Sequence, residues 1–148
     1  MKTAIFYYSE HHGNTKKLLN AIANADGNVT LIDTTKAADA DYTGYDLIGL
    51  ASGVYGGRPG KALTAYAERN LPEGKPVFLI LTSSMQRDGF FKSMRKTAGE
   101  KKCPVKGEYQ CEGYDTFGPF KLVGGVSKGH PDEKEIEGAV QFYQGLIV

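Results

Sequence analysis

The sequence predicts an α/β domain in which a parallel sheet is covered by helices on both faces. Short apolar runs alternate with stretches whose apolar residues recur at helical spacing, and this alternation continues to the C-terminus. The chain has 148 residues, enough for one ordinary domain with a sizeable core. No linker, repeat or low-complexity tract interrupts the order, so we expect a single domain over residues 1–148.

Five apolar runs predict five strands. They lie at Thr3–Tyr8, Asn28–Asp33, Leu47–Ala51, Val77–Leu81 and roughly Val105–Cys111. Each run is short and is followed by polar or small residues, as expected of a strand that crosses a buried sheet and then leaves it.

Helical spacing of apolar residues predicts helices between these strands. The segments are Asn14–Ala25, Lys61–Arg69, Phe90–Lys101 and Asp132–Leu146. Pro59 and Pro131 lie close to two of the expected starts, where a helix tolerates proline. The gap Thr34–Tyr45 is poorer in apolar residues, and we expect a short helix there.

Composition excludes several classes of protein. The formal net charge is +1 and 24% of the residues are charged, so no global field would attract nucleic acid or an acidic membrane. Neither a signal peptide nor a long apolar span is present, and we expect a cytoplasmic protein. Cys103 and Cys111 are eight positions apart; in an extended segment that is about 26 Å, too far for a disulfide. We expect two buried thiols.

One connection departs from this regular order. The segment Gly113–Gly129 is rich in glycine and aromatic residues and is far longer than a usual connection. Its apolar content is unlike that of a solvated tail. We therefore expect an ordered excursion that packs on the body of the domain.

Three glycine-bearing polar loops directly follow predicted strands. They begin at Ser9, Ser52 and Thr82. In an open parallel sheet, ligands bind beyond the C-terminal ends of the strands. The three loops therefore predict one cleft.

The first of these loops has the features of an anion site. It leads from a strand into a helix, so that backbone N–H groups and the positive end of the helix converge there. It has neither the lysine of a nucleoside-triphosphate loop nor the glycine pattern of a dinucleotide loop, which favours a terminal phosphate monoester. The candidate residues are Ser9, His11, His12, Gly13, Asn14 and Thr15.

Two alternatives remain open for this loop. Ser9 or Asn14 caps the helix with nothing bound, or the histidines are simply exposed to solvent rather than one of them contacting the phosphate. A metal pair is set aside because adjacent histidines on a turn diverge and no third ligand lies nearby in the sequence.

The second loop places an aromatic ring among small residues. Tyr55 can lie flat against a planar ligand or be an ordinary surface tyrosine. Together with a phosphate site, a stacking ring describes a nucleotide-like ligand. The candidates in this loop are Ser52, Gly53, Val54, Tyr55, Gly56 and Gly57, and those in the third loop are Thr82, Ser83 and Ser84. The third loop lacks the G-x-S-x-G elbow of a serine nucleophile, so hydrolysis is not expected.

The letters "GNT", "ASGVYGG" and "TSS" in these loops resemble the flavodoxin family of FMN-binding electron-transfer proteins, and the resemblance covers essentially the whole chain. It implies a doubly wound sheet of order 2-1-3-4-5 and FMN as cofactor. The phosphate would lie at Ser9–Thr15, one face of the isoalloxazine under Ser52–Gly57, and its pyrimidine end beside Thr82–Gly89. Tyr114, Met85 and Phe90 are the candidates for a second stacking side chain.

The chain also departs from the family pattern. The usual loop is T-x-T-G-x-T, with three steps from its first hydroxyl to the glycine, whereas Ser9 to Gly13 is four steps. The resemblance implies an electron carrier that serves redox partner proteins. Alternatives are a small FMN-dependent reductase and a flavin-free interaction module of the same fold. A flavin-free signalling domain of the receiver type shares this strand order but needs paired aspartates at the end of the first strand. This chain has Tyr7, Tyr8 and Ser9 there, which argues against a receiver domain.

Overall fold

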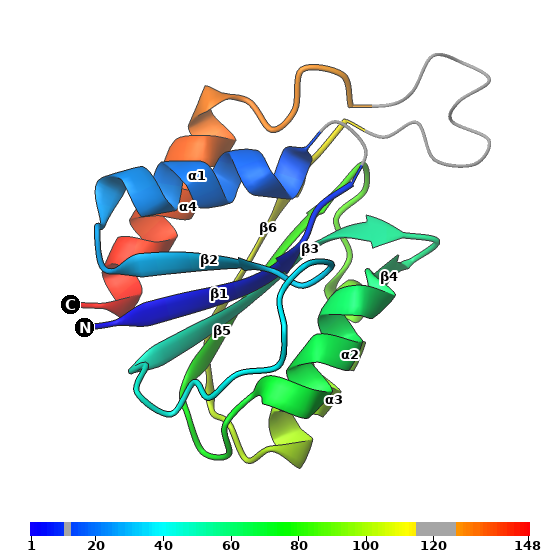
Figure 1. Cartoon of the computed structure of the whole chain (residues 1–148). Helices are drawn as coiled ribbons and strands as arrows, with labels where there is room; N and C mark the ends of the chain where they lie inside the picture. Colours follow the sequence, from blue (N-terminus) through cyan, green and yellow to red (C-terminus); the bar gives the residue numbers. More distant parts are fainter. Residues whose placement is uncertain (11–12, 115–126) are drawn as a thin grey trace.

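The computed structural model describes residues 1–10, 13–114 and 127–148. A parallel sheet forms its centre, and helices cover both faces (Figure 1). Helices α1 (Asn14–Ala25) and α4 (Glu133–Leu146) lie on one face. Helices α2 (Lys61–Asn70) and α3 (Lys92–Glu100) lie on the other. The predicted α/β class is confirmed.

The strands follow the expected order. The parallel strands are β1 (Thr3–Tyr8), β2 (Val29–Asp33), β3 (Leu47–Tyr55), β5 (Val77–Ser83) and β6 (Val105–Glu112). Their order is β2-β1-β3-β5-β6, and a two-residue strand β4 (Arg58–Pro59) pairs antiparallel with β3. With β4 set aside, this is the predicted order 2-1-3-4-5.

Alternate side chains of the central strands build two apolar layers. Leu79 and Leu81 face α2 and α3, whereas Phe78 and Ile80 face α1 and α4. All four are fully buried, and each side chain of this size contributes roughly 1.5–3 kcal/mol when it leaves water. The two free cysteines are buried in opposite layers, Cys103 with α2 and α3 and Cys111 with α1 and α4.

The short helix expected over Thr34–Tyr45 does not form. Aspartate side chains fold this segment into turns, since Asp33 accepts from the backbone N–H of Thr35 and Asp41 from that of Thr43. Such local hydrogen bonds compete with helix formation. The segment instead lies as an irregular loop against α2.

Two further boundaries differ from the prediction. Strand β3 continues through Ser52 to Tyr55, and Gly56 and Gly57, with φ of 61° and 82°, turn the chain into β4. The predicted loop Ser52–Gly57 is therefore a strand end and a tight hairpin turn, whose positive φ values suit glycine. The helix expected from Phe90 begins as a 3₁₀ turn, η1 (Asp88–Phe91), and becomes α-helical at Lys92.

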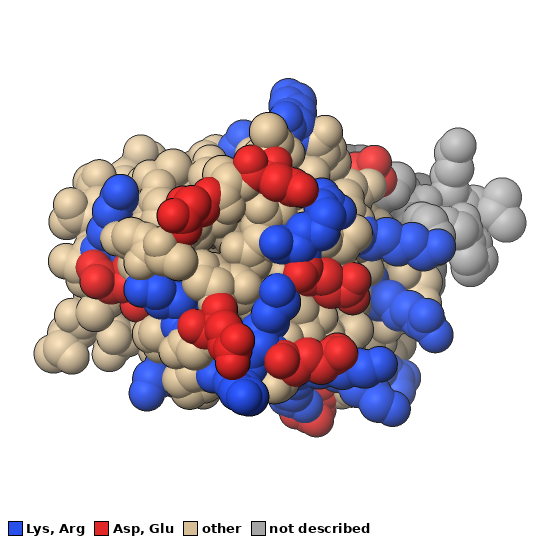
Figure 2. All heavy atoms as spheres, turned by 60° about the horizontal axis from the view of Figure 1, so that its bottom comes forward, with Lys and Arg blue, Asp and Glu red and all other residues tan. Residues whose placement is uncertain are grey.

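Within the described residues, no helix is long and apolar enough to cross a membrane. Figure 2 shows acidic and basic side chains interspersed over one face of the molecule. On α3, Arg95 pairs with Asp88 and Glu108. The charge of Arg95 is thus balanced by two acidic neighbours.

Candidate functional site

The C-terminal ends of β1, β3, β5 and β6 meet at a small cavity of about 20 Å³. Its lining joins residues from all three predicted loops with the end of β6: Glu10, Asn14, Gly53, Val54, Tyr55, Thr82, Ser83, Ser84, Gly113 and Tyr114. The expected convergence of the loops is therefore present. Glu10, which lies inside the predicted range Ser9–Thr15, and Gly113 were not singled out as candidate residues, although each directly adjoins one.

The remaining predicted residues stand elsewhere. Ser9, Gly13, Thr15, Ser52, Gly56 and Gly57 do not line the cavity. His11 and His12 lie outside the described residues, as do residues 115–126 of the expected excursion. The two ends of that excursion are described: Gly113 donates its N–H to the Ser83 carbonyl, and Ser127 Oγ donates to the Ser84 carbonyl.

The first turn of α1 presents backbone donors beside the cavity. Gly13 precedes the helix with φ of 64°, and Ser9 Oγ accepts from the N–H of Lys16 at 3.3 Å. Ser9 thus accepts from one amide of the first turn, although the N-cap residue itself is Gly13. The N–H groups of Asn14 and Thr15 have no acceptor within the described ranges. Free amides at the positive end of a helix suit a phosphate.

Two buried threonines join the first and third loops. Thr15 Oγ1 and Thr82 Oγ1 form a hydrogen bond of 2.9 Å, and both side chains are almost fully buried. Their hydroxyls are therefore used inside the protein. The pair fixes the start of α1 against the end of β5, which positions the amides of that first turn.

Asn14 is the most informative side chain of the cavity. Its Nδ2 donates to the Tyr114 carbonyl at 2.7 Å, whereas its buried Oδ1 has no hydrogen-bond partner in the described part of the chain. A buried acceptor without a donor costs about 1–3 kcal/mol. Among the described residues nothing donates to Oδ1, so this atom can accept from a hydroxyl or N–H group of a ligand.

FMN has groups that match both the amide donors of α1 and the acceptor Asn14 Oδ1. The phosphate of FMN would accept from the free amides of α1, and a ribityl hydroxyl would supply the donor that Asn14 Oδ1 lacks. The residues present therefore suit both parts of the FMN side chain.

Tyr55 crosses the site in this structure. Its hydroxyl accepts from the N–H of Glu10 at 2.9 Å. Its ring packs edge to face against the ring of Tyr8, with 5.5 Å between the ring centroids. Burial and a hydrogen bond with Glu10 raise the pKa of Tyr8 to about 12. The cavity that Tyr55 helps to line has a volume of only about 20 Å³, which is much smaller than an isoalloxazine ring.

Other hydroxyls of the loops hold backbone. Ser52 Oγ accepts from the N–H of Gly60, just before α2, and Ser83 Oγ donates to the Met85 carbonyl. These two side chains shape the hairpin and the turn after β5. They serve the site by positioning it.

Comparison with known proteins places this geometry in a family. Residues 4–113 match the family model described as flavodoxin domain. An uncharacterized protein of Methanocaldococcus jannaschii is 34% identical over 149 residues, which cover 99% of each chain.

Two solved structures share the fold at low identity. A short-chain flavodoxin associated with a non-canonical PDU bacterial microcompartment has a TM-score of 0.69 at 15% identity, over 99% of this chain and 97% of that one. A flavoprotein from Lactobacillus acidophilus NCFM, solved in complex with FMN, has a TM-score of 0.59 at 22% identity, over 74% of this chain and 92% of that one.

Proposed function

The chain belongs to the flavodoxin domain family, and from that premise we propose that it binds FMN at the ends of β1, β3, β5 and β6 and carries electrons between proteins. The observation that carries this proposal is the donor and acceptor set at the first turn of α1. Among the described residues nothing accepts from the N–H groups of Asn14 and Thr15, which suit the phosphate, and nothing donates to Asn14 Oδ1, which suits a ribityl hydroxyl. The FMN complex of the Lactobacillus flavoprotein supports the choice of flavin.

FMN, when bound, supplies the redox chemistry, and the protein supplies binding and orientation. Asn14 orients the side chain of the ligand and holds Tyr114 at the same time. The hydrogen bond between the Thr15 and Thr82 hydroxyls holds the first turn of α1, and with it the amides, against the end of β5. Tyr55 is the aromatic side chain of the hairpin that would cover one face of the ring.

FMN titration tests the proposal. The protein should quench flavin fluorescence on binding, and Asn14→Ala should weaken FMN binding by about 1 kcal/mol because one hydrogen bond is lost. Asn20→Ala, exposed on the same helix, is the matched control and should leave affinity unchanged. If FMN and riboflavin bind with the same affinity, the phosphate is not recognised and the proposal fails.

A groove beside the site favours a second candidate function, a small FMN-dependent reductase. The groove has a volume of about 610 Å³ and runs between the end of β1, β4, α2 and the start of α3. Its size is that of a small-molecule site, and it shares Tyr55 and Glu10 with the cavity. Ser93 Oγ, buried at the groove, has no partner within the described residues.

Turnover of a small quinone by reduced, FMN-loaded protein distinguishes the two functions. Ala65→Trp would place a large ring in the groove, since Ala65 is an exposed lining residue. For a reductase, this substitution should slow quinone reduction and leave FMN affinity unchanged. Ala25→Trp, at the far end of α1, is the control. Equal rates for all three proteins would contradict a substrate site in the groove.

A further inference from the structure

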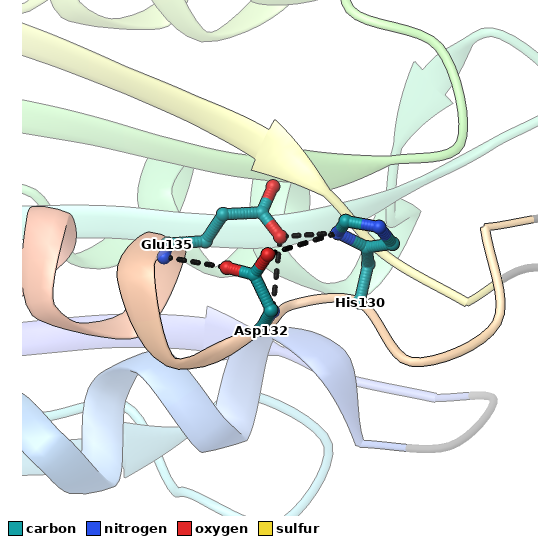
Figure 3. Close-up of side chains that lie close together, drawn as sticks. All are labelled: His130, Asp132 and Glu135. Carbon is teal, nitrogen blue, oxygen red and sulfur yellow. Dashed lines mark hydrogen bonds and ion pairs between the residues drawn. The ribbon is translucent and has the colours of Figure 1, made fainter.

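A cluster of charged side chains lies just beyond the end of β6. His130, Asp132 and Glu135 offer a ring nitrogen and carboxylate oxygens that all lie within 4.8 Å of one another. Figure 3 shows the His130 ring directed at the two carboxylates, which come from the start of α4. With Glu112 at the end of β6, these residues are called here the His130 cluster.

Hydrogen bonds connect the cluster to two elements. The Glu135 carboxylate accepts from the backbone N–H of Asp132 and from that of Glu112, each at 2.9 Å, and it also bonds His130 Nδ1. On the other side of the ring, Glu112 Oε2 lies 3.7 Å from His130 Nε2. A charged imidazole here would thus be faced by carboxylates from both β6 and α4.

The backbone of His130 leads from the cluster to the flavin site. Its carbonyl accepts from the N–H of Tyr114 at 2.9 Å. The Tyr114 carbonyl accepts from Asn14 Nδ2 at 2.7 Å, and Asn14 begins α1. Tyr114 is therefore held by His130 on one side and by Asn14 on the other. Asn14 is also the residue whose Oδ1 has no donor among the described residues.

We propose that His130 is a positioning residue of the flavin site, whose charged ring fixes the backbone of Tyr114 and through it Asn14, so that FMN affinity depends on the protonation of His130. This inference rests on the proposed function. It gives His130, which lies just before α4 and does not line the cavity, a role in binding.

The sign of the pH dependence follows from the charges around the ring. The hydrogen bond to Glu135 raises the pKa of His130, and the negative charges of Glu135, Glu112 and Asp132 act in the same direction. The charged ring attracts all three carboxylates, whereas the neutral ring keeps only a hydrogen bond. The contribution of the charged His130 ring to FMN affinity is therefore complete below about pH 6.5, the ordinary pKa of histidine. It is lost as the pH rises through the raised pKa of His130.

The experiment measures FMN dissociation constants of the wild type and two variants at about pH 5.5 and about pH 8.5, on either side of the histidine titration. His130→Gln keeps an N–H donor without a charge, and His130→Arg keeps the charge at both values. Both retain His11 and His12. The titration of those residues and of the FMN phosphate affects all three proteins alike. It therefore cancels in the ratio of the dissociation constants of variant and wild type at the same pH.

The wild type should bind FMN more tightly than His130→Gln at the lower pH by at least about threefold, a ratio well within reach of one charge-assisted contact. The advantage should vanish at the higher pH, while His130→Arg should bind tightly at both. Lys128→Gln, which removes a neighbouring exposed charge outside the cluster, should show no such loss with pH. A ratio of wild type to His130→Gln that is independent of pH would overturn the proposal.

Amide exchange tests the first link without any flavin. Protection of the Tyr114 N–H, relative to its intrinsic exchange rate, should fall with pH in the wild type and persist in His130→Arg. If FMN does not bind but this difference is seen, the proposed function fails and the link between His130 and Tyr114 stands. If protection is the same in both proteins at both values, His130 does not position Tyr114.

Discussion

At the scale of single residues, Gly13 is where the backbone itself shapes the site. Its φ of 64° lies in the left-handed region, and a Cβ there would meet no atom within 4 Å. Gly13→Ala should therefore lower the free energy of unfolding by about 1 kcal/mol through backbone strain alone. Urea unfolding measures this loss.

Gly99→Ala is the matched control for that substitution. Gly99 lies within α3, its Cβ would also meet nothing within 4 Å, and its φ is not positive. Alanine should raise stability there by up to about 1 kcal/mol because it favours a helix. Equal effects of the two substitutions would mean that the conformation of Gly13 is unstrained.

The sequence predicted the position of the candidate site better than its lining. Loops at strand ends follow from apolar runs, which are local, so the convergence of three loops was predictable. The direction of each side chain depends on partners far away in the chain. Thr15 is turned inward by Thr82, and Tyr55 is drawn across the site by the amide of Glu10. Neither contact has a local signature.

At the scale of elements, side chains of α2 hold the loop after β2, and Asn70 is one of them. Asn70 accepts from the N–H of Ala40 at 2.9 Å and donates to Asp39 at 3.0 Å, and it is only 7% exposed. Asn70→Ala leaves that N–H without its partner and should cost about 2 kcal/mol of unfolding free energy. Urea unfolding of Asn70→Ala checks this, and Asn20→Ala should change stability by less than about 0.5 kcal/mol.

This loop also shows where local patterns mislead. A short helix was expected over Thr34–Tyr45, the gap between two predicted strands, although the segment is poor in apolar residues. Here Tyr66 of α2 donates to the Ala38 carbonyl, and its hydroxyl also bonds that of Tyr42. The buried face of α2 thus fixes an irregular chain that covers the sheet. Strand β3, by contrast, extends beyond its apolar run to Tyr55 because β4 pairs with its last two residues.

At the scale of the whole molecule, charge is balanced in sequence and in space. The net charge is +1, and Figure 2 shows both signs interspersed over one face. No dominant field of one sign on that face would steer an oppositely charged partner. Stability is therefore expected to come from the two apolar layers, which extend along the full sheet and make unfolding a single cooperative step.

If unfolding is one cooperative step, a ligand that binds at one end of the sheet raises the free energy of unfolding of the whole molecule. If FMN binds only the folded chain, it should raise the unfolding free energy by about 2.7 kcal/mol at a free concentration 100 times its dissociation constant. The dependence on urea should keep its slope, because the surface exposed on unfolding is unchanged.

Urea unfolding with FMN and with riboflavin at equal concentration checks this linkage. Riboflavin lacks the phosphate, which the N–H groups of Asn14 and Thr15 would bind, since they have no acceptor among the described residues. It should therefore stabilise the protein less. The same increment from both flavins would show that the first turn of α1 contributes nothing to recognition. A changed slope would show instead that the ends of the strands unfold separately from the sheet, and that binding there is uncoupled from the apolar layers.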